Sequence, residues 1–305
     1  MIKIGMIGMS SGNAHPFSWS SIINGEFDSR EINNAGFPAV SDYLEANKDT
    51  LGISGAKVTH IWCDDKNLAE SISKSSGIDH VVDEINDLVS KVDGVILGRD
   101  DPNNHWVMAK PFIDANVPIF IDKPLTISNE ELNEYQIFID NGKFIMSCSS
   151  MRYSNELLAA KSILKKIGQI HLLTVVGKKD WTKYGVHMVE ATLSLLNDPM
   201  PISVQYIGKE DYDIVLLEIN ENCFATIHLI NDISPVFQLS VFGEKEWITV
   251  DIKNSYSMFK ENILEFIKSI SLGKPTLDFD KTSQVIKTVI AAIRSKELGG
   301  KKINI

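Results

Sequence analysis

Short apolar runs alternate with amphipathic stretches along the first half of the chain. The apolar runs cover residues 4–7, 57–63, 80–82, 94–97, 119–121 and 144–148, and each predicts a strand. The stretches between them, at 16–24, 67–74, 83–91, 104–115 and 129–140, are typical of helices. Strands that are apolar throughout and are each followed by a helix favour a parallel sheet covered on both faces. The pattern therefore predicts a doubly wound α/β domain.

The second half has a different rhythm, with strands that follow one another directly. Residues 170–177, 202–207, 214–219, 224–229, 236–242 and 247–250 predict strands, mostly joined as hairpins. Two helical stripes, at 259–270 and 285–293, close the chain. We expect an α+β domain with an open, largely antiparallel sheet, and we place the domains at 1–124 and 125–305.

About thirty residues, 26–55, separate the first helix from the second strand, where a short loop is usual. Residues 40–47 within this insertion could form a helix. Insertions of this length are often lids or binding loops. An added surface turn that stabilises the domain is an equal alternative.

Composition and charge narrow the class of protein. The 305 residues are 44% hydrophobic and 23% charged, as in ordinary globular proteins. A net charge of −10 disfavours binding to nucleic acid. No apolar stretch approaches the roughly 18 residues of a membrane helix, and no signal-peptide pattern precedes the first strand, so we expect a cytoplasmic protein. The cysteines, Cys63, Cys148 and Cys223, are too scattered for a disulfide framework or a zinc site, and we expect no metal.

The first strand runs into a turn of small residues, which are Gly8, Ser10, Ser11, Gly12 and Asn13. A strand, a glycine turn and a helix start place a pyrophosphate at a helix N-terminus in Rossmann dinucleotide-binding domains. The motif is degraded, because a serine stands where the second glycine of G-x-G-x-x-G is usual.

Two acids, Asp64 and Asp65, end the second strand. An acid here accepts hydrogen bonds from a ribose diol and repels a 2′-phosphate, which favours NAD over NADP as cofactor. Asp64 could instead cap the helix that follows.

The segment Phe120-Ile121-Asp122-Lys123-Pro124-Leu125 resembles the Glu-Lys-Pro signature of the Gfo/Idh/MocA oxidoreductases, the family of glucose–fructose oxidoreductase and inositol dehydrogenase. Three further segments are similar to that family in the same order: Asp101-Pro102-Asn103-Asn104-His105, Met151-Arg152-Tyr153 and Ala291-Ala292-Ile293-Arg294-Ser295. The resemblance implies a Rossmann NAD(P)-binding domain, then a substrate-binding and oligomerisation domain, and a sugar-like substrate.

The resemblance also implies roles for residues near the nicotinamide. Lys123 would contact the reacting hydroxyl, where a cation stabilises the alkoxide that develops as hydride leaves. Asp122 would position this lysine or the nicotinamide ribose. Folds of this kind hold ligands at the carboxyl ends of their strands. We therefore expect cofactor contacts from the segment after the fourth strand, at Arg99, Asp100, Asn103 and His105.

The family's second motif is an Asp-x-x-x-His on a helix, with an acid three residues later. Lys183, His187 and Glu190 match it and share one polar stripe of a helix with Ser194. The resemblance makes His187 the proton acceptor, a role that suits an imidazole near neutral pH. Arg152, Tyr153 and Trp181 are further candidates for the substrate cleft, with packing roles as the alternative.

Lys183 departs from the family, because a lysine replaces the usual carboxylate. It could bind an anionic substrate such as a phosphorylated or nucleotide sugar. Alternatively, Asp180 or Glu190 supplies the carboxylate, or the site is catalytically weakened.

Together these features predict hydride transfer between NAD and a secondary alcohol or ketone of a sugar, cyclitol or activated sugar. The alternative is a non-catalytic dinucleotide- or sugar-sensing regulator, which Lys183 favours and the retention of Lys123 and His187 disfavours. An open sheet leaves an apolar face that needs a cover, so we expect a homodimer or homotetramer.

Overall fold

The computed structural model describes residues 1–305 and divides into two compact units. The first unit comprises Met1–Thr126, Asn133–Ser147 and Phe259–Phe279, and the second comprises Ile127–Leu132, Cys148–Met258 and Asp280–Ile305. The chain therefore returns to the first unit twice after residue 126. None of its helices combines the length and the apolar character needed to cross a membrane.

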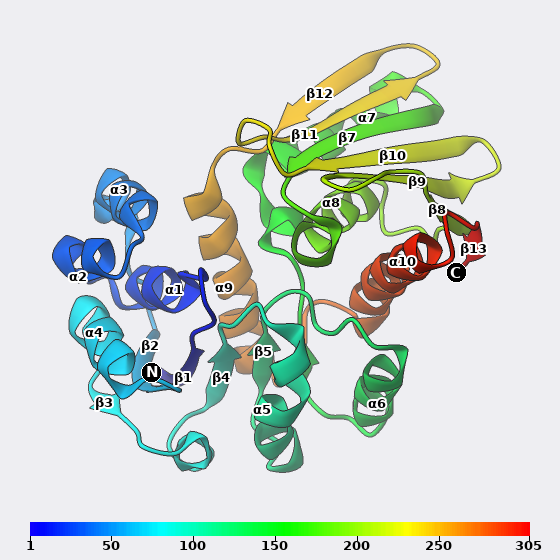
Figure 1. The fold of residues 1–305 in the computed structure, drawn as a ribbon. Helices are drawn as coiled ribbons and strands as arrows, with labels where there is room; N and C mark the ends of the chain where they lie inside the picture. Colours follow the sequence, from blue (N-terminus) through cyan, green and yellow to red (C-terminus); the bar gives the residue numbers. More distant parts are fainter. The chain divides into compact units, whose positions relative to one another are not determined.

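A six-stranded sheet organises the first unit (Figure 1). Its strands are β1 (Ile2–Gly8), β2 (Ala56–Cys63), β3 (His80–Val81), β4 (Gly94–Leu97), β5 (Ile119–Ile121) and β6 (Ile145–Met146). They lie in the order β3-β2-β1-β4-β5-β6 and every pairing is parallel. This order reverses between β1 and β4, and doubly wound folds bind their ligands at the carboxyl ends of the strands beside such a reversal. The prediction of a doubly wound parallel sheet is confirmed.

Helices follow the strands in this unit as the periodicity predicted, with one exception. They are α1 (His15–Asn24), α4 (Lys66–Ser76), α5 (Pro102–Asp114) and α6 (Asn129–Asp140), and α9 (Ser255–Leu272) adds a helix from late in the chain. Residues 83–91 were predicted as a helix, but only the 3-10 segment η2 (Ile85–Leu88) forms. The side chains of Leu88 and Val92 both pack against Gly5 of β1.

The insertion at residues 26–55 is packed onto α1. It forms α2 (Ser29–Asn34), α3 (Pro38–Ala46) and the 3-10 turn η1 (Lys48–Thr50). Ile32 and Leu44 are fully buried, and the Tyr43 hydroxyl donates to Ser18 of α1. The backbone N–H of Gly52 also donates to Ile22 at 3.0 Å. These contacts support the stabilising interpretation of the insertion.

Aromatic side chains connect α1, β5 and α9 in the core of the first unit. The Trp19 ring lies 5.8 Å from Phe120 and 5.9 Å from Phe259, and Phe120 lies 5.8 Å from Phe266, all between ring centroids. Ile270 of α9 lies so close to Gly94 that a Cβ there would be 2.6 Å from its Cδ1. Helix α9 is thus part of the core that supports β4 and β5.

The second unit contains a seven-stranded mixed sheet (Figure 1). Its strands are β7 (Ile170–Lys178), β8 (Ser203–Tyr206), β9 (Tyr212–Asn220), β10 (Cys223–Ile230), β11 (Phe237–Gly243), β12 (Trp247–Asp251) and β13 (Ile303–Asn304). The order is β12-β11-β7-β10-β9-β8-β13, and only the β7–β10 pair is parallel. The largely antiparallel sheet was predicted from the sequence, whereas β13 was not.

Three helices accompany this sheet, α7 (Asn155–Ile167), α8 (Trp181–Leu195) and α10 (Phe279–Glu297). We did not predict α7. Burial alternates along the strands, so that Val215, Leu217 and Ile219 are buried while Ile214 and Leu216 of the same strand are partly exposed. One face of the sheet therefore carries the core of the unit, and the other carries apolar side chains in contact with solvent.

Candidate active site

Two glycines shape the turn that joins β1 to α1. A Cβ on Gly8 would lie 2.5 Å from Cγ of Pro16, so glycine allows α1 to begin this close to the strand. Gly12 has a φ of +77°, and no atom lies within 4 Å of where its Cβ would be. Gly12 thus leaves the outer side of the turn open, beside the exposed Ser11 and the start of a helix, where an anion is favoured.

Ser10 ties this turn to the end of β4. Its hydroxyl donates to Asp100 Oδ1 at 2.6 Å and accepts from the Asp100 backbone N–H at 3.1 Å. Asp100 Oδ2 in turn lies 3.6 Å from Lys123 Nζ. The serine that degrades the glycine motif therefore makes contacts that a glycine could not make.

The buried Asp122 carboxylate binds a different set of partners. It accepts hydrogen bonds from the Asn13 side-chain amide at 3.2 Å and from the Lys123 backbone N–H at 2.7 Å, and His15 Nδ1 lies 2.5 Å away. Burial by itself would raise the Asp122 pKa, but His15 and Lys123 together hold that pKa below its usual value. Asp122 is therefore ionised at neutral pH and fixes the first residues of α1 against the end of β5.

The contact between His15 and Asp122 was not predicted from the sequence. The His15 ring stacks on Trp19 at 4.3 Å between centroids, with an interplanar angle of 11°. His15 is separated from Asp122 by 107 residues, so their proximity depends on the fold. The Lys123–Pro124 peptide, which follows directly, is cis.

Arg99 connects the ends of two strands. Its Nη1 pairs with Asp64 Oδ2 after β2, while Nε and Nη2 donate to Asp101 at 2.9 and 2.7 Å. The guanidinium is buried, whereas the Asp64 side chain is 57% exposed. Asp65, and not Asp64, caps α4 by accepting from the Asn67 backbone N–H at 2.9 Å. The Asp64 side chain is thus exposed directly after β2, the position of a ribose-binding acid in Rossmann folds.

His105 and Asn103, which were also predicted to contact the cofactor, have different environments from each other. His105 is fully buried, with Nδ1 3.1 Å from the Leu125 carbonyl and Nε2 3.0 Å from the Arg99 carbonyl. Burial lowers its pKa, so the neutral ring donates to one carbonyl at a time. His105 therefore connects the loop after β4 with the loop after β5. Asn103 is exposed in the first turn of α5.

In the second unit, His187 of α8 contacts a serine that we did not predict. Ser149 Oγ lies 2.6 Å from His187 Nδ1 and accepts from the Met151 backbone N–H at 3.2 Å. The Ser149 backbone N–H donates to Glu190 Oε2 at 3.3 Å. An Nδ1–H donated to this hydroxyl leaves Nε2 as the nitrogen that can accept a proton.

Glu190 and Arg152 pair with each other inside the unit. Arg152 Nε lies 2.5 Å from Glu190 Oε1, and its Nη2 lies 2.7 Å from Asp198 Oδ1. Both members of the pair are buried. Burial raises the pKa of Glu190, and the charge of Arg152 opposes that rise. Along the polar stripe of α8, Lys183 is thus exposed, whereas the Glu190 carboxylate is buried in an ion pair with Arg152.

The remaining substrate candidates have structural contacts. Trp181 is buried, and its Nε1 donates to the Val289 carbonyl at 3.2 Å. Asp180 caps α8 by accepting from the Lys183 backbone N–H at 3.1 Å. Tyr153 is half-buried at the end of the 3-10 segment η3 (Ser150–Tyr153).

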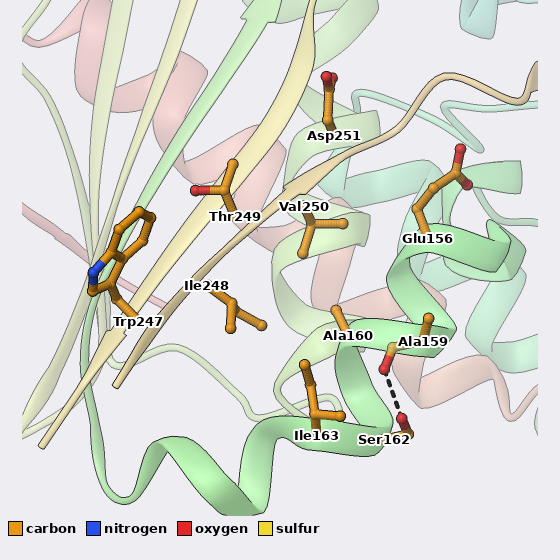
Figure 2. A pocket seen from close by; sticks show the side chains of 10 residues that line it. All are labelled: Glu156, Ala159, Ala160, Ser162, Ile163, Trp247, Ile248, Thr249, Val250 and Asp251. Atoms are coloured by element: carbon orange, nitrogen blue, oxygen red, sulfur yellow. Dashed lines mark hydrogen bonds between the residues drawn. The ribbon is translucent and has the colours of Figure 1, made fainter. Parts of the chain in front are cut away.

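A hollow of about 710 Å³ lies elsewhere in the second unit, between α7 and β12. Figure 2 shows Ile248 and Val250 of β12 on the side that faces Ala160 and Ile163 of α7, with Trp247 on the opposite side of the strand. The hollow is shallow, and none of the predicted site residues lines it. Although it is large, the hollow is therefore not a candidate for the active site.

Residues 2–146 match the family model GFO_IDH_MocA, described as "Oxidoreductase family, NAD-binding Rossmann fold". This part of the chain is thus similar to the NAD-binding domain of the Gfo/Idh/MocA oxidoreductases. The matched residues span the complete six-stranded sheet together with the glycine turn, Asp64 and the Asp122-Lys123-Pro124 signature. The predictions of the family and of an NAD-binding oxidoreductase are confirmed.

Solved structures show the same fold over the whole chain. A putative myo-inositol dehydrogenase from Sinorhizobium meliloti has a TM-score of 0.79 at 15% identity, with 100% of both chains covered. The scyllo-inositol dehydrogenase from Lactobacillus casei, solved with NAD(H) and scyllo-inositol, has 0.77 at 14%, covering 100% of this chain and 99% of that one. GenD2 from gentamicin A biosynthesis, in complex with NAD, has 0.79 at 15%, covering 100% and 96%. At these identities the likeness concerns the fold. No curated protein sequence matches this chain.

The residues that match the family model fit a bound dinucleotide. The turn at Gly12 is open to a phosphate at the N-terminus of α1. Asp64 Oδ2 is paired with Arg99, and its largely exposed side chain leaves Oδ1 for a ribose hydroxyl. These features occur at the carboxyl ends of β1, β2 and β4, the edge at which such sheets bind dinucleotides.

Proposed function

We propose that this protein is an NAD-dependent dehydrogenase or reductase that acts on a secondary alcohol or ketone of a sugar, cyclitol or activated sugar. The match to the family model and the inositol dehydrogenases among the structural relatives support this substrate class. The observation that carries the proposal is the environment of Lys123. Its ammonium lies at the carboxyl end of β5, beside Asp100, on the sheet edge that also holds the glycine turn.

The proposed chemistry assigns one task to each residue. NAD, when bound, supplies the acceptor or donor of hydride. Lys123 polarises the substrate oxygen and stabilises its negative charge as the carbon–hydrogen bond breaks. Asp100, whose Oδ2 lies 3.6 Å from the ammonium, holds it in place. His187 takes the hydroxyl proton on Nε2, while the hydrogen bond between Nδ1 and Ser149 fixes the orientation of its ring.

We further propose that the substrate is anionic, because Lys183 has neighbours of the same charge. Lys178 and Lys179 precede the Asp180 cap, and Lys183 occupies the first turn of α8. Asp180 and Asp213 accept hydrogen bonds from the first backbone N–H groups of α8, so these two carboxylates offset only part of the charge of the three ammonium groups. A phosphate or carboxylate on the substrate would neutralise this local excess.

Turnover with a panel of compounds tests the proposal. Cyclitols, hexoses, sugar phosphates and nucleotide sugars are each incubated with NAD, and NADH formation is followed by absorbance. We expect at least one compound to be oxidised, and Lys123→Ala to lower kcat by about a thousandfold while NADH still binds. Lys110→Ala, at an exposed lysine of α5, is the matched control and should turn over as the wild type does.

The opposite result is equally informative. A protein that binds NADH but oxidises no compound, and that reduces none of the corresponding ketones with NADH, would contradict the catalytic proposal. The sensing regulator would then be the better description, and the cationic residues at the start of α8 would form its ligand-binding surface.

A further inference from the structure

The ion pairs of Arg99 span the end of β1. Arg99 follows β4 and Asp64 follows β2, and β1 lies between these strands in the sheet. To reach Asp64, the Arg99 side chain must cross the carboxyl end of β1, where the glycine turn begins. The guanidinium thus lies at the sheet edge where the adenosine ribose of a dinucleotide binds in this fold.

This placement is unusual for a site that favours NAD, because arginine is the residue that recognises a 2′-phosphate. Here the guanidinium is already occupied on two sides. Asp101 accepts from Nε and Nη2, and Asp64 pairs with Nη1. Two carboxylates against one guanidinium leave a local charge of −1, which repels a phosphate dianion.

The same pairs also fix Asp64. Its side chain is exposed on the protein surface, where a lone aspartate would sample several rotamers. Pairing with a buried guanidinium holds the carboxylate in one place and leaves its second oxygen for the ribose. Arg99 is itself held by the two N–H groups that donate to Asp101, the first residue before α5.

We propose that Arg99 is a specificity-determining residue for the dinucleotide, which positions Asp64 for the NAD ribose and becomes a 2′-phosphate ligand once Asp64 is removed. The inference rests on the proposed function, since it requires the first unit to bind a dinucleotide. It goes beyond that function by assigning NAD preference to a three-residue cluster, Asp64–Arg99–Asp101, and not to Asp64 alone.

Titration of wild-type and variant proteins with NADH and NADPH, followed by tryptophan fluorescence, tests the inference without any substrate. Wild type should bind NADH at least about tenfold more tightly than NADPH. Asp64→Ser should bind NADPH at least about tenfold more tightly than wild type does, because its free guanidinium N–H groups can bind the 2′-phosphate. In Asp64→Ser/Arg99→Gln this gain should disappear.

Asp65→Ser is the matched control. It removes the same charge one residue away and keeps a good helix cap, but it leaves Arg99 paired with Asp64. Its NADPH affinity should therefore not show the gain seen in Asp64→Ser. Thermal unfolding of each variant shows whether the first unit is folded, and Asp64→Ser changes only an exposed position, so its result stands without the double variant.

The outcomes separate two kinds of failure. If wild type binds NADH and Asp64→Ser gains no affinity for NADPH, the role of Arg99 is wrong while the proposed function stands. The same holds if the gain persists in the double variant, because the guanidinium is then not its source. If wild type binds neither dinucleotide, the proposed function fails and the inference fails with it.

Discussion

Asp122 and Lys123 are adjacent in the sequence, but their side chains have different partners. The Asp122 carboxylate contacts Asn13 and His15 at the start of α1, and the Lys123 ammonium lies beside Asp100 after β4. Asp122 therefore fixes the glycine turn and the start of α1. The negative charge beside Lys123 is that of Asp100, which follows a different strand, β4.

Asp122→Asn should destabilise the first unit in a pH-dependent way. At pH 7 we expect the free energy of unfolding to fall by about 2–4 kcal/mol, because a buried, paired carboxylate is lost. The folded-state pKa of Asp122 lies below the unfolded value, so its contribution is present above about pH 4 and is lost as the pH falls through the folded-state pKa. The difference between variant and wild type should therefore shrink at lower pH.

Denaturant unfolding of both proteins at pH 7 and near pH 3 measures this difference. Asp83→Asn, which removes an exposed carboxylate paired with Lys66, is the control and should matter little at either pH. A loss for Asp122→Asn that is the same at both pH values would show that the charge of Asp122 does not contribute.

In the proposed mechanism Ser149 acts through His187, so its removal should affect kcat more than KM. With a substrate found by the panel, we expect Ser149→Ala to lower kcat about tenfold, with KM changed less than about twofold. Ser149→Thr keeps the hydroxyl and should restore most of the rate. Ser162→Ala, at an exposed serine of α7, is the control. A threonine variant as slow as the alanine variant, or a purely KM effect, would exclude the positioning role.

At the scale of elements, the start of α8 is where the proposed substrate charge can be tested. Lys183→Glu places a negative charge beside Lys178 and Lys179 at the helix N-terminus. We expect KM for a phosphorylated substrate to rise at least about tenfold, and KM for its neutral parent to change much less. Lys166→Glu, at an exposed lysine of α7, should alter neither constant. Equal effects of Lys183→Glu on both substrates would refute an anion site here.

The sequence predicts elements well where one strong local signal decides them. Buried parallel strands are apolar throughout, so 94–97 and 119–121 were predicted with the bounds that β4 and β5 have. Helix α7 was missed, although Leu157, Ala160 and Ile167, which are buried, recur at helical spacing in its sequence. The apolar stripe of α9 was recognised, but such a stripe does not specify which surface covers it. Its packing against Gly94 and Phe120 depends on the fold.

For the candidate site, the sequence indicated the motif residues but not the partners that contact them. Lys123, His187 and Asp64 stand in motifs, and motifs are local. The contacts that hold them, Lys123 with Asp100, His187 with Ser149 and Asp64 with Arg99, join residues separated by 23, 38 and 35 positions. No spacing rule predicts such pairs, because helical and strand periodicities relate only near neighbours. The role of Ser10 was missed for the same reason.

At the scale of the whole molecule, an apolar row on the second unit supports the expected oligomer. Phe224, Leu172, Phe242 and Trp247 lie opposite one another on β10, β7, β11 and β12, and are 38%, 38%, 38% and 65% exposed. Four large apolar side chains in register on one sheet face form the kind of patch that protein interfaces cover. We propose that a second copy of the chain covers it.

Sedimentation velocity at micromolar concentration tests this proposal. Wild type should sediment as a dimer or tetramer, and Phe242→Lys should shift it toward monomer, because a charge in an apolar interface is poorly tolerated. Val107→Lys places the same charge at an exposed valine of α5, in the first unit, and should leave the assembly intact. A wild-type protein that is entirely monomeric at this concentration would refute the proposal.

The binding of NADH to the wild-type protein tests the proposed dehydrogenase function most directly. Protein shown to be free of retained cofactor is titrated with NADH and with NADPH, and tryptophan quenching and energy transfer to the nicotinamide are recorded. We expect micromolar binding of NADH and much weaker binding of NADPH, through the open turn at Gly12 and the carboxylate of Asp64. Binding of neither dinucleotide would contradict the proposed function.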